Sequence, residues 1–220
     1  SLESQKSKRT EKTINTVLAA VYSFYEFQER LGAVEPINGF RTEYPRKRKY
    51  KSLLHHINKS KPVQKKLIKL KEPRTFPGAL SPEEVKQLIE ACNRLRDKFL
   101  VCLLYETGLR IGEALGLRHE DIKSMGKSEI HVVPRGDNFN NARSKGGTER
   151  VVHASTDLMS LYSQYLIDEY PEDIDSDYVF LNLWEGERGN PMTYAAVDSL
   201  FRRLRKKTGI DAHPHLLRHT

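Results

Sequence analysis

Residues 98–122 read "KFLVCLLYETGLRIGEALGLRHEDI", and this stretch decides the fold. Its first part is apolar on every side, which is typical of a helix at the centre of a protein, and Gly108 predicts where that helix ends. Arg110 follows two residues later, at the start of a short helix that we expect to end near Gly116. A guanidinium at the edge of a buried helix is costly unless it meets a carboxylate or another anion. Glu113, three residues further on, is a candidate structural partner.

The segments around this stretch predict an α+β class, a mainly α-helical fold with a small antiparallel β-sheet. Ser81 is a predicted helix N-cap, with Pro82 at the first helical position and Glu84 completing a capping box. Segments 128–134 and 148–154 predict strands joined by a polar hairpin, and 177–183 favours a further short strand. Helices are expected at 155–170 and 193–209. The expected buried faces of the three helices are Val85, Leu88, Ile89 and Cys92, then Leu158, Leu161, Tyr162 and Tyr165, then Val197, Leu200, Phe201 and Leu204.

The composition is that of a soluble globular protein, because hydrophobic residues make up 38% and charged residues 30% of the 220 residues. No apolar run is long enough for a transmembrane helix, and the first residues lack the apolar core of a signal peptide. Cys92 and Cys102 lie in apolar helical patterns, so we expect buried thiols. These features favour an intracellular protein.

The positive charge lies in the first third of the chain. Residues 1–75 hold 18 Lys and Arg against 7 Asp and Glu, a net charge of +11, whereas the remainder holds 19 against 22, a net of −3. A solvated basic tail is the plain explanation, but apolar residues are interleaved through the same region. The density of charge on one side therefore favours a polyanion as partner, most simply nucleic acid.

Residues 9–32 predict an amphipathic helix with Ile14, Val17, Leu18, Val21 and Tyr25 on one face and a stop at Gly32. The start of this helix carries basic and hydroxyl side chains whose donors suit a phosphate. Thr10 or Thr13 can equally serve only as the N-cap of the helix. Residues 40–80 read as short helical pieces and a linker rather than a strand, with a boundary near Pro73 to Pro77. The candidate DNA-binding residues of this region are Lys8, Arg9, Thr10, Lys12, Thr13, Lys61, Lys65, Lys66 and Lys69.

Several familiar catalytic patterns are absent from the sequence: a P-loop, a dinucleotide glycine motif, CxxC or HExxH metal spacings and a GxSxG elbow. Chemistry must therefore depend on arginine, lysine and histidine. Three stretches supply them. Arg110 lies at the start of the short helix after Gly108, Lys145 stands beside two glycines at the hairpin tip, and "HPHLLRHT" occupies 213–220. In the last, His215 and Arg218 share one helical face and can converge on a single ligand.

Together these stretches resemble the tyrosine recombinase family, the phage and transposon integrases. The resemblance rests on "ETGLRIGEALGLRHEDI" and "HLLRHT", with the lysine hairpin between them in the expected order, and it covers Thr75 to Thr220. It implies a partial helical core-binding DNA-binding domain with its linker at 1–74, and a C-terminally incomplete catalytic domain at 75–220. It also implies double-stranded DNA and other recombinase protomers, in a tetramer, as partners, and a cytoplasmic, nucleoid-associated location without a membrane partner.

The resemblance further implies a role for each matched residue. Arg110 and Arg218 would grip the non-bridging oxygens of the scissile phosphate, and Lys145 would protonate the departing 5′ oxygen as general acid. His215 would contact the phosphate and assist proton transfer, while His219 is expected to be structural. Neither a metal ion nor a nucleotide cofactor is needed, because a phosphotyrosyl linkage conserves the energy of the broken phosphodiester.

In this family the nucleophilic tyrosine lies some tens of residues beyond the HxxR motif. All ten tyrosines of this chain precede that motif, the last being Tyr194. We therefore expect a recombinase fragment that binds DNA without cleaving it. The alternatives are a non-catalytic DNA-binding accessory protein or an inactive relative. A type IB topoisomerase relative shares the chemistry, but the small size and the "HLLRHT" motif favour an integrase.

Overall fold

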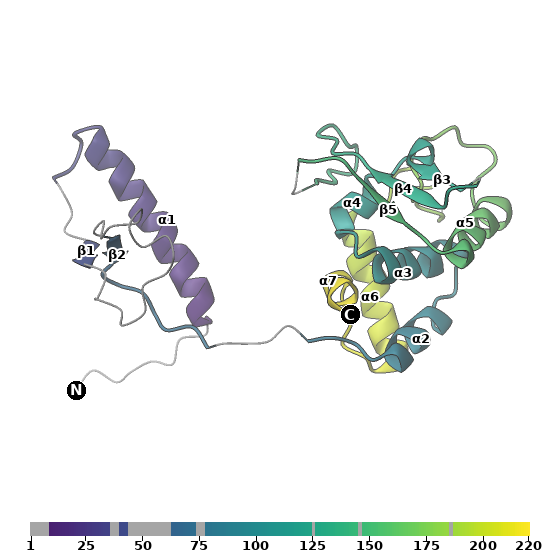
Figure 1. The fold of residues 1–220 in the computed structure, drawn as a ribbon, viewed down its shortest axis with the longest axis horizontal. Coiled ribbons are helices and arrows are strands. Elements are labelled where there is room, and N and C mark those ends of the chain that lie inside the picture. Colours follow the sequence, from purple (N-terminus) through teal and green to yellow (C-terminus); the bar gives the residue numbers. More distant parts are fainter. Residues whose placement is uncertain are drawn as a thin grey trace, which may run out of the picture. The chain divides into compact units, whose positions relative to one another are not determined.

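A computed structural model describes residues 9–35, 40–43, 63–73, 78–124, 126–144, 147–184 and 187–220 (Figure 1). The chain divides into two compact units, Ser1–Thr75 and Phe76–Thr220. Each unit has its own secondary structure, and the sites considered below all lie within one unit or the other.

The first unit contains a long helix, α1 (Glu11–Arg30), and two strands, β1 (Phe40–Glu43) and β2 (Val63–Lys66). The strands pair antiparallel, with Phe40 opposite Lys66 and Glu43 opposite Val63. The prediction that this region contains no strand was therefore wrong. The pairing joins segments about twenty residues apart, and such long-range backbone hydrogen bonding has no signal in local composition.

Helix α1 ends where the sequence predicts, but its contacts with the rest of the first unit are not made mainly by the predicted apolar face. Gly32 adopts a left-handed φ of 70° just beyond the helix, which only glycine adopts without strain. The predicted apolar face is only partly covered, because Ile14 and Leu18 are half-buried while Val17, Val21 and Tyr25 remain exposed. Instead, Asn15 exchanges hydrogen bonds with the backbone N–H and C=O of Leu70, both 2.9 Å. A polar side chain, rather than the apolar face, therefore links the helix to the segment after β2.

The second unit is mainly helical and carries a three-stranded antiparallel sheet in the order β3-β4-β5, so the predicted fold class is confirmed. Its elements, in chain order, are α2 (Pro82–Glu90), α3 (Leu95–Thr107), α4 (Ile111–Leu115), the 3₁₀ turn η1 (His119–Asp121), β3 (Ile122–Lys123), β4 (Glu129–Val132), β5 (Arg150–His153), α5 (Thr156–Asp168), α6 (Tyr194–Thr208) and α7 (Pro214–His219).

Helix α3 forms the centre of this unit, as the sequence predicted. Figure 1 shows it surrounded by the other elements, and it packs against α2, α4, α5 and α7. Five of its apolar side chains are completely or almost completely buried: Phe99, Leu100, Val101, Leu103 and Leu104. Only the last turn of α3 is exposed, at Tyr105 and Glu106, so its end at Thr107 presents the following residues at the edge of the core.

The predicted helix faces hold, with differences at their margins. Val197, Leu200, Phe201 and Leu204 of α6 are all buried, whereas Ile89 and Cys92 near α2 and Leu161 of α5 are only partly buried. Burial raises the pKa of the Cys92 thiol to about 12 and that of Cys102 to about 11, so both are protonated at neutral pH.

Segment 177–183 is not a strand of the sheet. It makes only isolated bridges, Arg118 with Tyr178 and Leu181 with Pro191. The apolar run Val179–Leu181 is buried as a connecting segment, which shows that burial alone cannot distinguish a strand from a covered loop. Among the described residues, no helix has the length and apolar character needed to cross a membrane.

Candidate active site

Arg110 lies at the turn between α3 and α4. Helix α3 ends at Gly108, whose left-handed φ of 60° lets the chain reverse, and Arg110 is the N-cap residue of α4. The backbone N–H of Arg110 donates to Oε2 of Glu113 at 2.9 Å, and its Nη1 donates to Oε1 at 3.2 Å. The ion pair suggested by the three-residue spacing is present. The Arg110 side chain nevertheless remains 42% exposed.

Glu113 is the buried anion of this region, and its side chain is completely inaccessible to solvent. A second arginine, Arg150 at the start of β5, binds both of its oxygens, at 3.0 Å from Nη1 to Oε1 and 2.6 Å from Nη2 to Oε2. Burial opposes ionisation of Glu113, but the hydrogen bonds from Arg150 and Arg110 prevail and lower its pKa to about 2. The carboxylate is therefore ionised at any physiological pH.

The contact between Arg150 and Glu113 was not predicted from the sequence, and the face of β5 that carries Arg150 is visible only in the structure. Residues two apart in a strand lie on the same face, so Arg150 shares a face with Val152. Val152 packs against the core, while Val151 between them is exposed. Arg150 therefore lies on the core-facing side of β5, although residues 150–153 show no alternation of polar and apolar residues that would predict it.

Arg218 reaches the same region from α7. This helix begins with His213, whose Nδ1 accepts the N–H of Leu216 at 3.2 Å, and Leu217 anchors it in the core. Helix α7 packs against α3. The Arg218 stem lies against Gly108, because a Cβ at Gly108 would stand 3.9 Å from Arg218 Cγ. The Nη1 atom of Arg218 is buried and has no hydrogen-bond partner among the described residues.

His215 is the exposed member of the cluster. Its Nε2 lies 2.9 Å from Nε2 of His219, one turn further along α7. Partial desolvation, followed by the positive fields of His219, His213, Arg218 and Arg110, lowers the pKa of His215. Because His215 and Arg218 share α7 and the Arg218 stem lies against Gly108, two residues before Arg110, the three side chains belong to the same part of the second unit.

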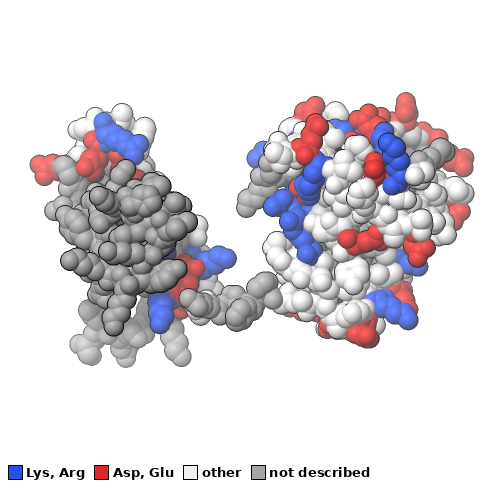
Figure 2. All heavy atoms as spheres, viewed as in Figure 1, with Lys and Arg blue, Asp and Glu red and all other residues white. Residues whose placement is uncertain are grey.

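This cluster has the features of an oxyanion site. Arg110 follows the turn at Gly108 against which the Arg218 stem lies, and the buried Nη1 atom of Arg218 lacks the acceptor that a buried donor requires. Figure 2 shows Lys and Arg side chains gathered along the edge of the unit where α4 and α7 lie. A tetrahedral or pentacoordinate phosphate would supply several acceptors and negative charge at once. In the described part of the chain, no group of three or more His, Cys, Asp or Glu residues is placed to hold a metal ion.

The predicted hairpin lysine, Lys145, lies outside the described residues. The chain just before it is held against the start of α6, since the N–H of Arg143 donates to the hydroxyl of Tyr194 at 3.2 Å. The carbonyl of Arg143 lies so close to Gly112 that a Cβ there would collide with it. The hairpin therefore leaves the domain beside the helix that Arg110 begins.

The predicted DNA-binding residues belong to the first unit. Lys8 and Lys61 lie outside the described residues, and Lys65 and Lys66 lie on β2, where only the backbone is described. Arg9, Thr10, Lys12, Thr13 and Lys69 are exposed. Thr10 caps α1 by accepting the N–H of Thr13 at 3.3 Å, so the N-cap alternative is realised for this threonine.

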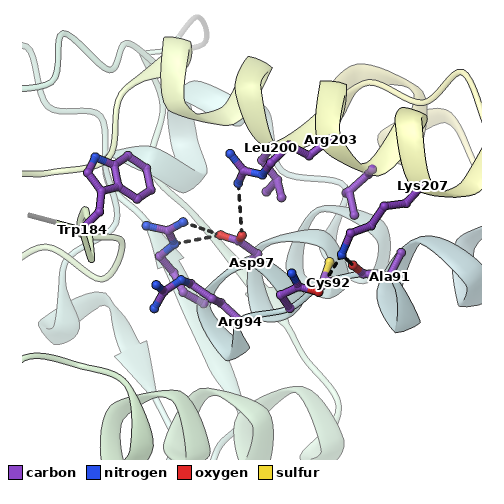
Figure 3. A pocket seen from close by; sticks show the side chains of 11 residues that line it. Ala91, Cys92, Arg94, Asp97, Trp184, Leu200, Arg203 and Lys207 are labelled. Atoms are coloured by element: carbon purple, nitrogen blue, oxygen red, sulfur yellow. Dashed lines mark hydrogen bonds and ion pairs between the residues drawn. The ribbon is translucent and has the colours of Figure 1, made fainter.

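A separate cavity of about 260 Å³ lies between the start of α3 and α6, and it contains none of the predicted site residues (Figure 3). Figure 3 shows Arg203 directed at Asp97, at 3.6 Å, and Lys207 directed at the Ala91 carbonyl, at 2.9 Å. The buried Arg96 also pairs with Asp97. These cations already have protein partners. The contacts that line the cavity therefore serve to hold α6 against the start of α3.

Comparison with known proteins shows the family to which the chain belongs. Residues 79–220 match the model of the phage integrase family. The chain is 46% identical over 219 residues to transposase A from transposon Tn554 of Staphylococcus aureus, and 33% identical over 155 residues to the tyrosine recombinase XerA of Pyrococcus horikoshii. The chain therefore belongs to the phage integrase family of tyrosine recombinases, as the motifs predicted.

The match covers this chain more fully than it covers the relatives. All of the chain but only 60% of transposase A is aligned, and 70% of the chain is aligned with 50% of XerA. Among solved structures, the crystal structure of XerA recombinase superposes with a TM-score of 0.55 at 31% identity, over 67% of this chain and 50% of that one. The Tn1549 transposon integrase, solved with a circular intermediate DNA, shares the fold at 20% identity, with a TM-score of 0.54 over 69% of this chain and 54% of that one.

Proposed function

We propose that this chain is the DNA-binding and phosphate-gripping portion of a transposase or integrase that cuts and rejoins DNA through a 3′-phosphotyrosyl intermediate. The observation that carries the proposal is the buried Arg218 donor that lacks an acceptor, on a side chain that lies against the turn just before Arg110. The 46% identity with transposase A along the whole chain supports transposition as the biological setting.

In this proposal the two arginines stabilise the transition state. Arg110 and Arg218 bind the non-bridging oxygens of the scissile phosphate, whose negative charge increases as phosphorus becomes pentacoordinate. His215 contacts the same phosphate and assists proton transfer. A preorganised donor of this kind contributes about 3–4 kcal/mol, or a hundredfold to a thousandfold in rate.

The remaining steps require a nucleophile and an acid. A tyrosine oxygen forms a bond to phosphorus while the bond from phosphorus to the 5′ oxygen breaks, and Lys145 transfers its proton to that departing oxygen. We propose that the tyrosine belongs to a segment beyond this chain, and that the chain by itself binds DNA without cleaving it. Its last tyrosine, Tyr194, already accepts a hydrogen bond from Arg143.

The proposed partner is double-stranded DNA in the bacterial cytoplasm, bound by a tetramer of protomers. The first unit would act as a core-binding domain, and its net charge of +11 over residues 1–75 suits the phosphate backbone. The exposed cations at the start of α1 are the proposed contacts. Sequence-specific recognition would require further contacts to base edges.

A suicide-substrate cleavage assay tests the function. The protein, extended to the length of its relatives, is mixed with nicked DNA carrying the element's own ends, beside Arg218→Ala and the matched control Arg188→Ala. Arg188 is an exposed arginine paired with Asp173 away from this cluster. We expect a covalent adduct in wild type and in Arg188→Ala but not in Arg218→Ala. Tight binding without an adduct would indicate a non-catalytic DNA-binding protein.

A further inference from the structure

Two arginines share one buried carboxylate at the proposed site, and they use it unequally. Arg150 binds both oxygens of Glu113 through its two terminal nitrogens. The guanidinium of Arg110 makes a single contact, from Nη1 to Oε1 at 3.2 Å. The described residues give the Arg110 guanidinium no other protein partner.

This unequal sharing has a chemical consequence. A buried carboxylate needs a counter-charge, and the most favourable arrangement with an arginine is the bidentate pair. Arg150 occupies that arrangement, so the remaining N–H donors of Arg110 are free to bind another acceptor. Without Arg150, Glu113 would draw Arg110 into the bidentate pair and compete with a phosphate for its donors.

We propose that Arg150 is a positioning residue that occupies Glu113 and thereby keeps Arg110 available to the scissile phosphate. The inference rests on the proposed function for its setting, but the competition itself concerns only Arg110, Glu113 and Arg150. It makes a specific prediction: loss of Arg150 is harmful because Glu113 remains, so removing the charge of Glu113 as well restores much of the loss.

The first test uses the 220-residue chain without DNA and inorganic phosphate as the probe. Phosphate is titrated into wild type, Arg150→Met, Glu113→Gln and the double variant, while the guanidinium NMR signal of Arg110 is followed. We expect weaker binding, by about tenfold, in Arg150→Met and recovery in the double variant. Unchanged binding in Arg150→Met, or no response of Arg110 in wild type, would overturn the inference.

Arg135→Met provides the matched control, because Arg135 binds the buried Asp121 through the same two-pronged pair, at 2.7 and 2.8 Å, without contacting Arg110. Its loss carries a comparable structural cost. We expect Arg135→Met to lower the melting temperature while leaving phosphate binding at Arg110 unchanged. If Arg135→Met weakens phosphate binding as much as Arg150→Met, the effect is merely structural and the inference fails.

The second test measures single-turnover cleavage in the extended protein. We expect Arg150→Met to slow cleavage about tenfold or more while DNA affinity changes little, and the double variant to recover most of the rate. A double variant as slow as Arg150→Met would contradict the proposed competition. If extended wild type does not cleave, the proposed function fails, whereas the phosphate titration still decides the role of Arg150.

Discussion

At the scale of single residues, Glu113 connects stability with the site. Its carboxylate is buried between a backbone N–H and two guanidinium groups, which come from the start of α4 and from β5. The same contacts that stabilise the ion therefore fix the geometry of Arg110. Loss of its charge therefore weakens the fold directly, whereas its effect on phosphate binding depends on which arginine it holds.

The low pKa of Glu113 predicts a pH-dependent contribution to stability. Because its pKa falls from 4.5 to about 2 on folding, the ionised group stabilises the fold above pH 4.5, and this stabilisation is lost as the pH falls toward 2. Its full size is on the order of 3 kcal/mol. Urea unfolding of wild type and Glu113→Gln should show a large difference at pH 6 that shrinks near pH 2. A difference independent of pH would refute the assignment.

Gly112 predicts a steric limit in the same helix. A Cβ at this position would collide with the carbonyl of Arg143 and the hydroxyl of Tyr194. We expect Gly112→Ala to lower the free energy of unfolding by about 1–3 kcal/mol, because the backbone neighbour cannot move aside. Gly136→Ala is the control, since nothing lies within 4 Å of its added Cβ and its φ is not positive. Equal stability of the two variants in chemical denaturation would contradict this packing.

At the scale of secondary-structure elements, α2 is stabilised by its capping box. The Ser81 hydroxyl accepts the N–H of Glu84 at 3.2 Å, and the Glu84 carboxylate accepts the N–H of Ser81 at 2.8 Å. Ser81→Ala should cost about 1 kcal/mol of unfolding free energy, because one helix N–H loses its acceptor. Ser160→Ala on the exposed side of α5 should change stability little, as its hydroxyl only bonds the Thr156 carbonyl within the helix. Urea denaturation of both variants measures the difference.

At the scale of the whole molecule, the uneven charge predicts salt-sensitive DNA binding. With about 6–10 phosphates neutralised, affinity should fall about a thousandfold or more between 50 and 200 mM salt. Fluorescence anisotropy with a labelled duplex measures this slope. We expect Lys69→Gln in the first unit to reduce the slope by about one. Lys86→Gln is the control, because Lys86 is equally exposed but pairs with Glu90 on α2. A flat salt dependence would argue against phosphate contacts by the basic region.

The chain also shows which features a sequence determines without its tertiary structure. The helix ends at Ser81 and Gly108, the buried faces of α5 and α6 and the order of the motifs were predictable. Each depends on contacts between residues a few positions apart, or on a periodicity that repeats along the chain. The likeness of "ETGLRIGEALGLRHEDI" and "HLLRHT" to one family was readable for the same reason.

Tertiary structure decided the rest. Four features depend on residues that are distant in sequence: the pairing of β1 with β2, the burial of segment 177–183 outside the sheet, the exposed apolar side of α1 and the bidentate contact of Arg150 with Glu113. Arg150 and Glu113 are separated by 37 positions, and only the packing of β5 beside α4 brings them together. Local propensity predicts where a helix or strand begins, but the free energy of a buried ion pair is set by whichever partner the fold places beside it.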